Sequence, residues 1–192
     1  GVLTSFKNQF HEEGTWGLLR FLGGRIGTAI SELNPIIIRN TDRQHLLSND
    51  FHLSAFRYRE SNLLYSLSQR MRSMIKSGLS AYQAALKCQQ HMIALAEAFV
   101  ERTVLEQFTS VLETQKEEST HSALQQLCQL YALHTIEKHS GWYLEKEYIS
   151  GAKSKAIRGL VDDLCLQTRH QAQALVEAFD IPDALLGAPI IR

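Results

Sequence analysis

Proline is scarce in this chain of 192 residues, where only Pro35, Pro182 and Pro189 occur. All three lie outside the middle of the chain, and proline is the residue that most strongly breaks a helix. Residues 51–179 therefore contain nothing that forbids helix. Glycine is concentrated near the start, with five glycines between residues 14 and 27. This distribution predicts a helical start, then an irregular arm, then a long helical region.

Cysteine is nearly absent as well, and Cys88, Cys128 and Cys165 are separated by at least 37 residues. This odd, dispersed set fits neither a disulfide framework nor a clustered zinc site, and it favours a reducing compartment. Each cysteine falls among apolar residues at helical spacing. We therefore interpret all three as small core residues and not as nucleophiles.

The chain also lacks net charge, because 20 Lys and Arg residues balance 20 Asp and Glu residues. That balance excludes a basic field for nucleic acid and a polybasic patch for an anionic membrane. Long apolar runs are missing too: the best candidate, Met92 to Val100, is interrupted by Glu97, so no membrane span is predicted. No basic region leads into an apolar core at the N-terminus, so no signal peptide is predicted. With 44% hydrophobic and 21% charged residues, the composition is that of a globular protein.

The chain is rich in apolar residues spaced three and four apart, which is the pattern of amphipathic helices. Serine, asparagine and aspartate at helix starts, and glycine at helix ends, supply the expected boundaries. The four expected helices run from residues 48–50 to Gly78, from Ser80 to about Glu113, from the turn at 114–119 to His139–Gly141, and from Ser150 or Ser154 to Pro182.

Four amphipathic helices with short turns and no convincing strand alternation indicate an all-α, up-down-up-down four-helix bundle. We divide the chain into an N-terminal helix and arm, residues 1–47, and the bundle, residues 48–192. The isoleucine-rich run from Pro35 to Arg39 is the one plausible extended segment, and we expect it to lie against the bundle. Residues 51–76 are mostly basic and residues 97–118 mostly acidic, so these helices are expected to pack together, although each solvated ion pair contributes only about 0–1 kcal/mol.

Several patterns resemble functional sites but have simpler explanations. Glu118 and His121 form one Glu-x-x-His pair, whereas a di-iron bundle needs two such pairs and further glutamates, so we predict no metal site. The glycine run at residues 23–27 lacks the Gly-Lys-Ser/Thr of a phosphate loop and favours a flexible elbow. His91 and His134 lie on or beside apolar helix faces, where we expect hydrogen-bonded structural histidines.

The most unusual polar cluster is Arg57-Tyr58-Arg59-Glu60 on the first bundle helix. One interpretation, which we favour, is ion pairing within and between helices. The other is that an arginine meets another domain or an anionic cofactor, because its planar guanidinium suits carboxylate and phosphate groups. The residues alone do not choose between the two, and Arg57 and Arg59 are our candidates for an interface with the rest of the protein.

Longer strings are more specific than periodicity. They are Asp50-Phe51-His52-Leu53-Ser54-Ala55-Phe56-Arg57-Tyr58-Arg59-Glu60 followed by Leu63-Leu64, then Leu133-His134-Thr135-Ile136-Glu137-Lys138, Trp142-Tyr143-Leu144, and Leu175-Val176-Glu177-Ala178-Phe179-Asp180-Ile181-Pro182. In this order they resemble the C-terminal helical domain of the acyl-CoA oxidases, within the acyl-CoA dehydrogenase/oxidase superfamily. The likeness begins at Val2-Leu3-Thr4 and extends to Pro189-Ile190, so it covers nearly the whole chain.

The resemblance implies part of an FAD-dependent enzyme of fatty acid β-oxidation, which desaturates acyl-CoA to trans-2-enoyl-CoA and reduces oxygen to hydrogen peroxide. In that family the glutamate that removes the α-proton belongs to a Thr-Phe-Glu-Gly-Glu/Asp-Asn motif. Here the only Glu-Gly pair, Glu13-Gly14, continues with Thr15-Trp16, so no residue of this chain is assigned a catalytic role. The resemblance places most FAD and CoA contacts in upstream domains, leaves cofactor-binding residues in this chain unknown, and implies a role in domain packing and in a homodimer.

Two alternatives are an acyl-CoA dehydrogenase relative with a different electron acceptor and a stand-alone helical protein-interaction module. The final residues, Ile190-Ile191-Arg192, lack a peroxisomal address of the Ser-Lys-Leu type. We therefore expect a bacterial cytoplasmic enzyme, or a peroxisomal one if the source is eukaryotic.

Overall fold

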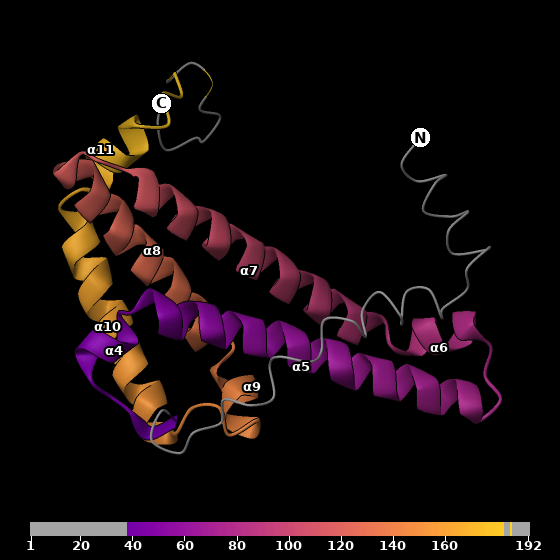
Figure 1. Cartoon of the computed structure of the whole chain (residues 1–192). Helices are drawn as coiled ribbons and strands as arrows, with labels where there is room; N and C mark the ends of the chain where they lie inside the picture. The colour runs from indigo at the N-terminus through magenta and orange to yellow at the C-terminus, as the bar shows by residue number, and fades with distance from the viewer. Residues whose placement is uncertain (1–37, 183–184, 186–192) are drawn as a thin grey trace.

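The computed structural model of the chain describes residues 38–182 and residue 185. Within these ranges every regular element is a helix, as Figure 1 shows. The predicted all-α class is confirmed for this part of the chain, whereas the up-down-up-down order of a four-helix bundle stays a prediction. The long helices are α5 (Asn49–Lys76), α7 (Gln89–Thr114), α8 (Glu118–Lys138) and α10 (Gly151–Arg169), and the short ones are α4 (Arg43–Leu46), α6 (Ala81–Lys87), α9 (Ser140–Glu145) and α11 (Ala172–Glu177).

The ends of α5 follow the sequence signals closely. The Ser48 hydroxyl accepts a hydrogen bond from the Phe51 amide at 3.3 Å, which satisfies one of the free donors of the first turn. At the other end Gly78 adopts φ +97°, and its amide donates to the Ile75 carbonyl at 3.0 Å. The Leu79 amide donates to the Met74 carbonyl at 3.2 Å, which completes a Schellman motif. The predicted stop at Gly78 is confirmed.

The second predicted helix is wrong in one respect, because the structure divides it into α6 and α7 at Cys88. Its start is confirmed: Ser80 and Gln83 exchange side-chain-to-backbone hydrogen bonds in a capping box. Cys88 has φ −99° and ψ 7°, outside the helical region, and is buried. Apolar residues on both sides of the break pack toward α5, so the apolar spacing continues across it and gave no sign of the kink.

The fourth predicted helix is also too long. It ends at Arg169 instead of Pro182, and the separate helix α11 follows after a turn at His170 and Gln171. The predicted core positions Val176 and Phe179 are exposed, and α11 buries none of its residues. The apolar spacing predicted a core-facing side for this segment, and that prediction is wrong within the described residues. The short helix α9 was not predicted, because its six residues contain too little periodicity.

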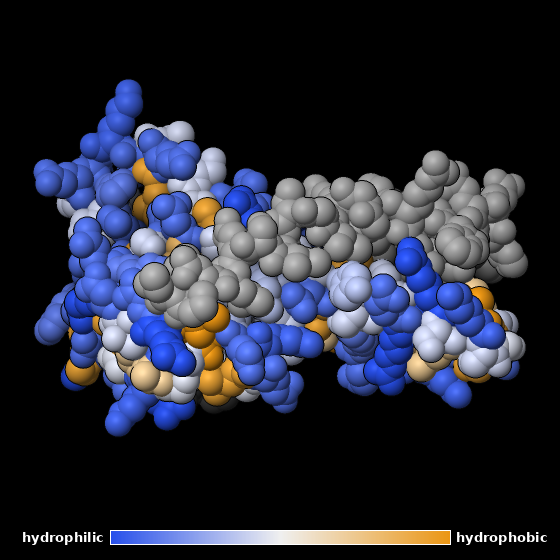
Figure 2. Space-filling model, turned by 60° about the horizontal axis from the view of Figure 1, so that its bottom comes forward, coloured by the Kyte–Doolittle hydropathy of each residue, from blue (hydrophilic) through white to orange (hydrophobic). Residues whose placement is uncertain are grey.

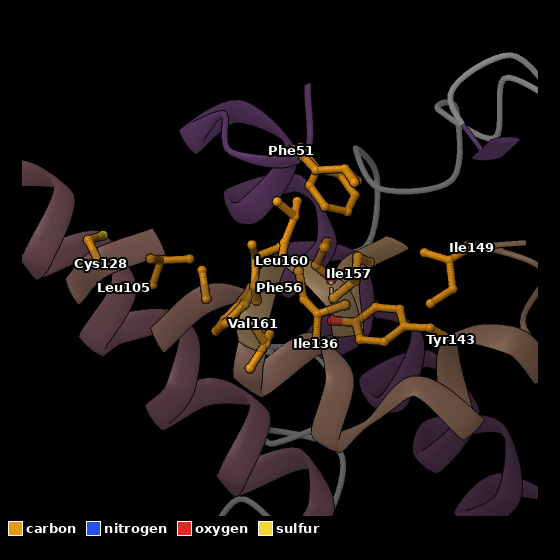
Figure 3. Packing of buried hydrophobic residues seen from close by; sticks show 14 of the residues in the cluster. Phe51, Phe56, Leu105, Cys128, Ile136, Tyr143, Ile149, Ile157, Leu160 and Val161 are labelled. Atoms are coloured by element: carbon orange, nitrogen blue, oxygen red, sulfur yellow. Dashed lines mark hydrogen bonds between the residues drawn. The ribbon is translucent and has the colours of Figure 1, made fainter. Parts of the chain in front are cut away.

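Two apolar clusters lie along the pair formed by α5 and α7. The small cluster joins Leu67, Met71 and Cys88 where α6 meets the end of α5. The main core lies where α4, the first half of α5 and the second half of α7 meet α8, α9 and α10. In Figure 3, Tyr143 of α9 points into this core near Ile136, and its hydroxyl donates to the Ala55 carbonyl at 3.0 Å. Tyr143 thus buries its ring without leaving its hydroxyl unpaired.

The first described residues of the arm contact the helical core, because the Ser150 amide donates to the Ile38 carbonyl at 3.2 Å. Ile38 and Arg39 are helical, and the remainder of the predicted extended run, with the N-terminal helix and the glycine elbow, lies outside the described residues. Leu46, which precedes the predicted boundary at residue 47, belongs to the main core. The division into residues 1–47 and 48–192 stays a prediction.

The surface is mostly polar on the face drawn in Figure 2, where apolar residues form small separate patches. Scattered apolar side chains of this kind are ordinary on protein surfaces. Among the helices of the described ranges, none combines the length and the apolar character needed to cross a lipid bilayer.

Candidate functional site

The strongest polar cluster of the structure ties α5, α7 and α8 together. At its centre the Arg59 guanidinium donates to the Glu101 carboxylate at 2.5 Å, and the two side chains are only 6% and 15% exposed. Arg59 follows Ala55 by one turn and precedes Leu63 by another, so it occupies a buried register of α5. A charge in this position needs a partner, because a buried guanidinium without one is costly.

Glu101 satisfies further donors from the end of α8. The Lys138 ammonium lies 3.3 Å and the His139 Nε2 3.2 Å from the same carboxylate oxygen. Burial alone would raise the pKa of Glu101, but the hydrogen bond from His139 and the charge of Arg59 outweigh it and lower the pKa to about 2. The Tyr131 hydroxyl donates to the Glu101 backbone carbonyl at 3.1 Å. The ionised Glu101 carboxylate therefore holds basic side chains of α5 and of the end of α8 against α7. Its low pKa makes it a poor general base.

A second group of ion pairs lies nearer the surface of α5 and α7. Arg57 donates to Glu106 at 3.0 Å, and Arg102 donates to both Glu60 and Glu106. The predicted packing of a basic α5 against an acidic α7 is confirmed by these contacts and by Arg59 with Glu101. Arg57, Arg59 and Glu60 thus form ion pairs between helices of this chain, as the favoured interpretation predicts.

The two interface candidates differ in what they offer to a partner. The Arg57 side chain is 59% exposed, so it can meet another surface while it contacts Glu106. Arg59 is buried and engaged with Glu101, so any effect on an interface passes through the packing of α5 on α7. Their interface role stays a prediction.

Sequence reasoning missed a buried basic cluster beside α4. His52 is fully buried, and its Nε2 donates to the Leu46 carbonyl at 2.7 Å, while none of the described residues supplies a hydrogen-bond partner for its Nδ1. Burial lowers the pKa of His52 to about 4. Lys153 of α10 is also fully buried, with its Nζ 3.1 Å from the His45 Nε2 and 3.9 Å from the centre of the Phe51 ring.

The basic groups of this cluster have lower pKa values than they would have in water, so their neutral forms are favoured. Burial lowers the pKa of Lys153 to about 8, and burial together with Lys153 lowers the pKa of His45. A sequence signal existed for His52, because it lies one turn before Ala55 and Phe56 in the buried register of α5. Lys153 has the same kind of signal, because it lies one turn before Ile157 and two turns before Leu160 in the buried register of α10.

The predicted structural histidines have different outcomes. His91 is confirmed, because its Nε2 lies 3.0 Å from the Leu63 carbonyl and 3.1 Å from the Ser66 hydroxyl. His134 is exposed, so its prediction is wrong. It lies beside the apolar face of α8 but on the solvent side of that border.

The cysteine prediction holds for two residues of three. Cys88 and Cys128 are buried, and burial raises the pKa of the Cys128 thiol to about 11. Cys165 is exposed on α10, contrary to the prediction. It follows Leu164 directly, so helical rotation turns it away from the core.

Glu118 and His121 lie in the first turn of α8, where an acid is favourable to the helix dipole. Within residues 38–182 and 185, His, Cys, Asp and Glu side chains form no group of three that could hold a metal ion.

The comparisons with known proteins agree on one family. A family model described as acyl-CoA oxidase matches residues 49–192. The acyl-coenzyme A oxidase 2, peroxisomal, of Arabidopsis thaliana is 36% identical over 176 residues, which are 92% of this chain and 25% of that protein.

Solved structures show the same helical architecture. Acyl-CoA oxidase 1 of Yarrowia lipolytica superposes with a TM-score of 0.71 at 28% identity, covering 78% of this chain and 22% of that one. Acyl-CoA oxidase 1 of Caenorhabditis elegans, complexed with FAD and ATP, superposes with a TM-score of 0.70 over 86% of this chain and 27% of that one, and its 15% identity supports the fold alone. The chain spans about a quarter of the length of these relatives.

Proposed function

Because the chain belongs to the acyl-CoA oxidase family, we propose that it is the C-terminal helical part of an FAD-dependent enzyme that desaturates acyl-CoA to trans-2-enoyl-CoA and reduces oxygen to hydrogen peroxide. The chain matches only about a quarter of the length of its relative, which supports the proposal that the other three quarters of the enzyme perform a different role. FAD and the acyl-CoA substrate are then held mainly by upstream domains. No catalytic residue is assigned to this chain.

The role of this part is to support domain packing and a homodimer. One observation carries this proposal: the most buried ion pairs among the described residues join helices of this part to each other. Arg59 and Glu101 join α5 to α7, and Lys138 and His139 extend the pairing to the end of α8. A catalytic site needs polar groups that face a substrate, whereas these groups hold helices in a fixed arrangement.

The activity is tested with the full-length enzyme from the gene that contains this chain. We expect flavin absorbance in stoichiometric amount and oxygen-dependent formation of hydrogen peroxide and trans-2-enoyl-CoA from acyl-CoA. The isolated chain should purify without flavin colour. Electron transfer to an electron-transfer flavoprotein with no peroxide would favour the dehydrogenase alternative, and a gene that encodes no flavin-binding region would favour the interaction module.

The interface role is tested at Arg57, because its exposed ion pair contributes at most about 1 kcal/mol and its loss leaves the fold intact. Arg57→Ala in the full-length enzyme should weaken dimerisation or lower the flavin content. Arg70→Ala, an exposed arginine on the same helix, is the matched control. If Arg57→Ala keeps the dimer, the flavin and the melting temperature of the parent enzyme, Arg57 has no interface role. Both interface candidates are tested together with the double variant Arg57→Ala/Arg59→Ala. Because Arg59 is buried, the melting temperature of this variant is measured too, so that a loss of fold stability can be distinguished from a loss of docking.

The location depends on the source organism. The Arabidopsis relative is named as peroxisomal. We propose a peroxisomal location for a eukaryotic source and a cytoplasmic one for a bacterial source. Fluorescence microscopy of the full-length enzyme, fused at its N-terminus to a fluorescent protein, distinguishes the two.

A further inference from the structure

All three methionines of the chain lie in the small cluster where the end of α5, α6 and the start of α7 meet. Met71 is only 4% exposed, whereas Met74 and Met92 are half-buried and pack against the cluster from its edge. Met71 and Met74 share one face of α5, and Met92 follows Cys88 by one turn. The Cys88 thiol donates to the Met74 Sδ over 4.0 Å. The cluster thus contains one methionine that is shielded from solvent and two that are partly exposed.

The position of α6 depends on this small cluster. The helix has seven residues, and an isolated helix of that length is not stable in water. It buries only Ala84, packs Ala85 against the cluster and ends at the buried Cys88. The main core contains no residue of α6, and in Figure 1 this helix and the adjoining end of α5 lie away from α8 and α10. A change in the polarity of the small cluster therefore acts directly on the attachment of α6.

Hydrogen peroxide makes such a change at a thioether. The sulfur lone pair attacks one peroxide oxygen, an S–O bond forms and the O–O bond breaks. The departing hydroxide takes a proton and leaves as water, so the methionine gains one oxygen atom while the peroxide is reduced. The resulting sulfoxide is polar, and contact with apolar side chains is then unfavourable because the S–O group has no hydrogen-bond partner there.

We propose that Met74 and Met92 are sites at which hydrogen peroxide modifies this protein, and that their oxidation releases α6 from α5. The inference rests on the proposed function for the source of the oxidant, because that reaction forms hydrogen peroxide at each turnover. A sulfoxide at Met74 replaces the acceptor of the Cys88 thiol, and a sulfoxide at Met92 lies one turn from Leu95 of the same cluster. Both changes weaken the packing that holds α6.

The sites are tested by adding dilute hydrogen peroxide to the full-length enzyme. The oxygen gained by each methionine is followed with time by mass spectrometry of the peptides. We expect Met74 and Met92 to be oxidised at least tenfold faster than Met71, which is shielded from solvent. Hydrogen–deuterium exchange of the α6 amides should become at least tenfold faster once both sites are oxidised.

Leucine variants separate the sites from other effects of peroxide. Met74→Leu/Met92→Leu keeps the apolar character and approximate volume of both side chains but has no thioether at either position. Peroxide should therefore leave the exchange of its α6 amides unchanged. Met71→Leu is the matched control, and its α6 amides should respond to peroxide as those of the parent enzyme do.

The other outcomes each refute a defined part of the proposal. Equal oxidation rates at the three methionines would refute the assignment of Met74 and Met92 as the sites. Oxidation of both without faster exchange in α6 would refute the release of this helix, and so would an undiminished response in the double leucine variant.

A second measurement replaces the added peroxide with acyl-CoA and oxygen. The same two methionines should then be oxidised during turnover, and catalase should prevent their oxidation. If added peroxide modifies Met74 and Met92 but acyl-CoA yields no peroxide, the modification sites stand and the proposed function fails.

Discussion

Replacing Glu101 with glutamine isolates the energetic role of the buried ion pair, because glutamine has the shape of the neutral carboxyl. The pKa of Glu101 falls from 4.5 to about 2 in the folded chain. A change of one unit corresponds to 1.36 kcal/mol, so the ionised form gains about 3 kcal/mol over the neutral one. Its side chain is only 15% exposed, so solvent screening reduces this value little. We expect Glu101→Gln to lower the free energy of unfolding by about 3 kcal/mol at pH 7.

The matched control is Glu97→Gln, one turn earlier on α7. Glu97 is 52% exposed and contacts Lys138 at 3.7 Å, so its loss should cost at most about 1 kcal/mol. Both variants are measured by urea denaturation followed by circular dichroism. Equal losses for the two would refute the argument that burial of the Arg59 partner makes the difference.

The same reasoning predicts a pH dependence for Glu101. Because its folded pKa is depressed, its contribution is fully present above the unfolded pKa of 4.5 and is lost as the pH falls toward 2. The parent chain should therefore lose more stability than Glu101→Gln between pH 5 and pH 2. Parallel curves for the two proteins in this range would show that the carboxylate is not the titrating group.

Three further predictions use other buried groups. Burial lowers the pKa of His52 from 6.5 to about 4. Between these pH values His52 binds a proton in the unfolded chain but not in the folded chain, so the free energy of unfolding should fall by about 3 kcal/mol as the pH drops from 6.5 to 4. Urea titrations should show this loss in the parent and not in His52→Leu. Leu105→Ala removes a fully buried side chain from the main core and should cost about 2–5 kcal/mol in the same assay, and a loss below 1 kcal/mol would contradict its placement. Maleimide should label native Cys165 promptly and leave Cys88 and Cys128 unmodified until the chain is unfolded, as mass spectrometry can show.

The sequence predicted the beginnings and ends of helices well where the capping residues lie next to the helix end that they cap. Ser48, Gly78 and the Ser80 capping box are determined by residues within one turn, so the sequence contained the whole explanation. The break at Cys88 and the early end of α10 were missed for the opposite reason. At both places the apolar spacing continues, and the next helix begins without a side-chain cap that the sequence could reveal.

The polar cluster was only partly predictable. Opposite charges on α5 and α7 indicated that the helices pair, but not that Arg59 is buried while Arg57 is exposed. That difference follows from helical rotation, which brings Arg59 into line with Ala55 and Leu63. The basic cluster of His45, His52 and Lys153 joins α4 and α5 to α10, and contacts over such a distance in sequence leave no local pattern.

The packing of α5 on α7 and of α8 on α10 has a consequence for the order of folding. Helices that are near neighbours in sequence close short loops, and chains dominated by such contacts fold within microseconds to milliseconds. The seam between α4 and α10 is different, since Arg43 meets Asp163 across 120 residues and Lys153 meets His45 across 108. We expect this seam to close last and to open first, so amides of α4 should exchange with deuterium before those at the centre of α5.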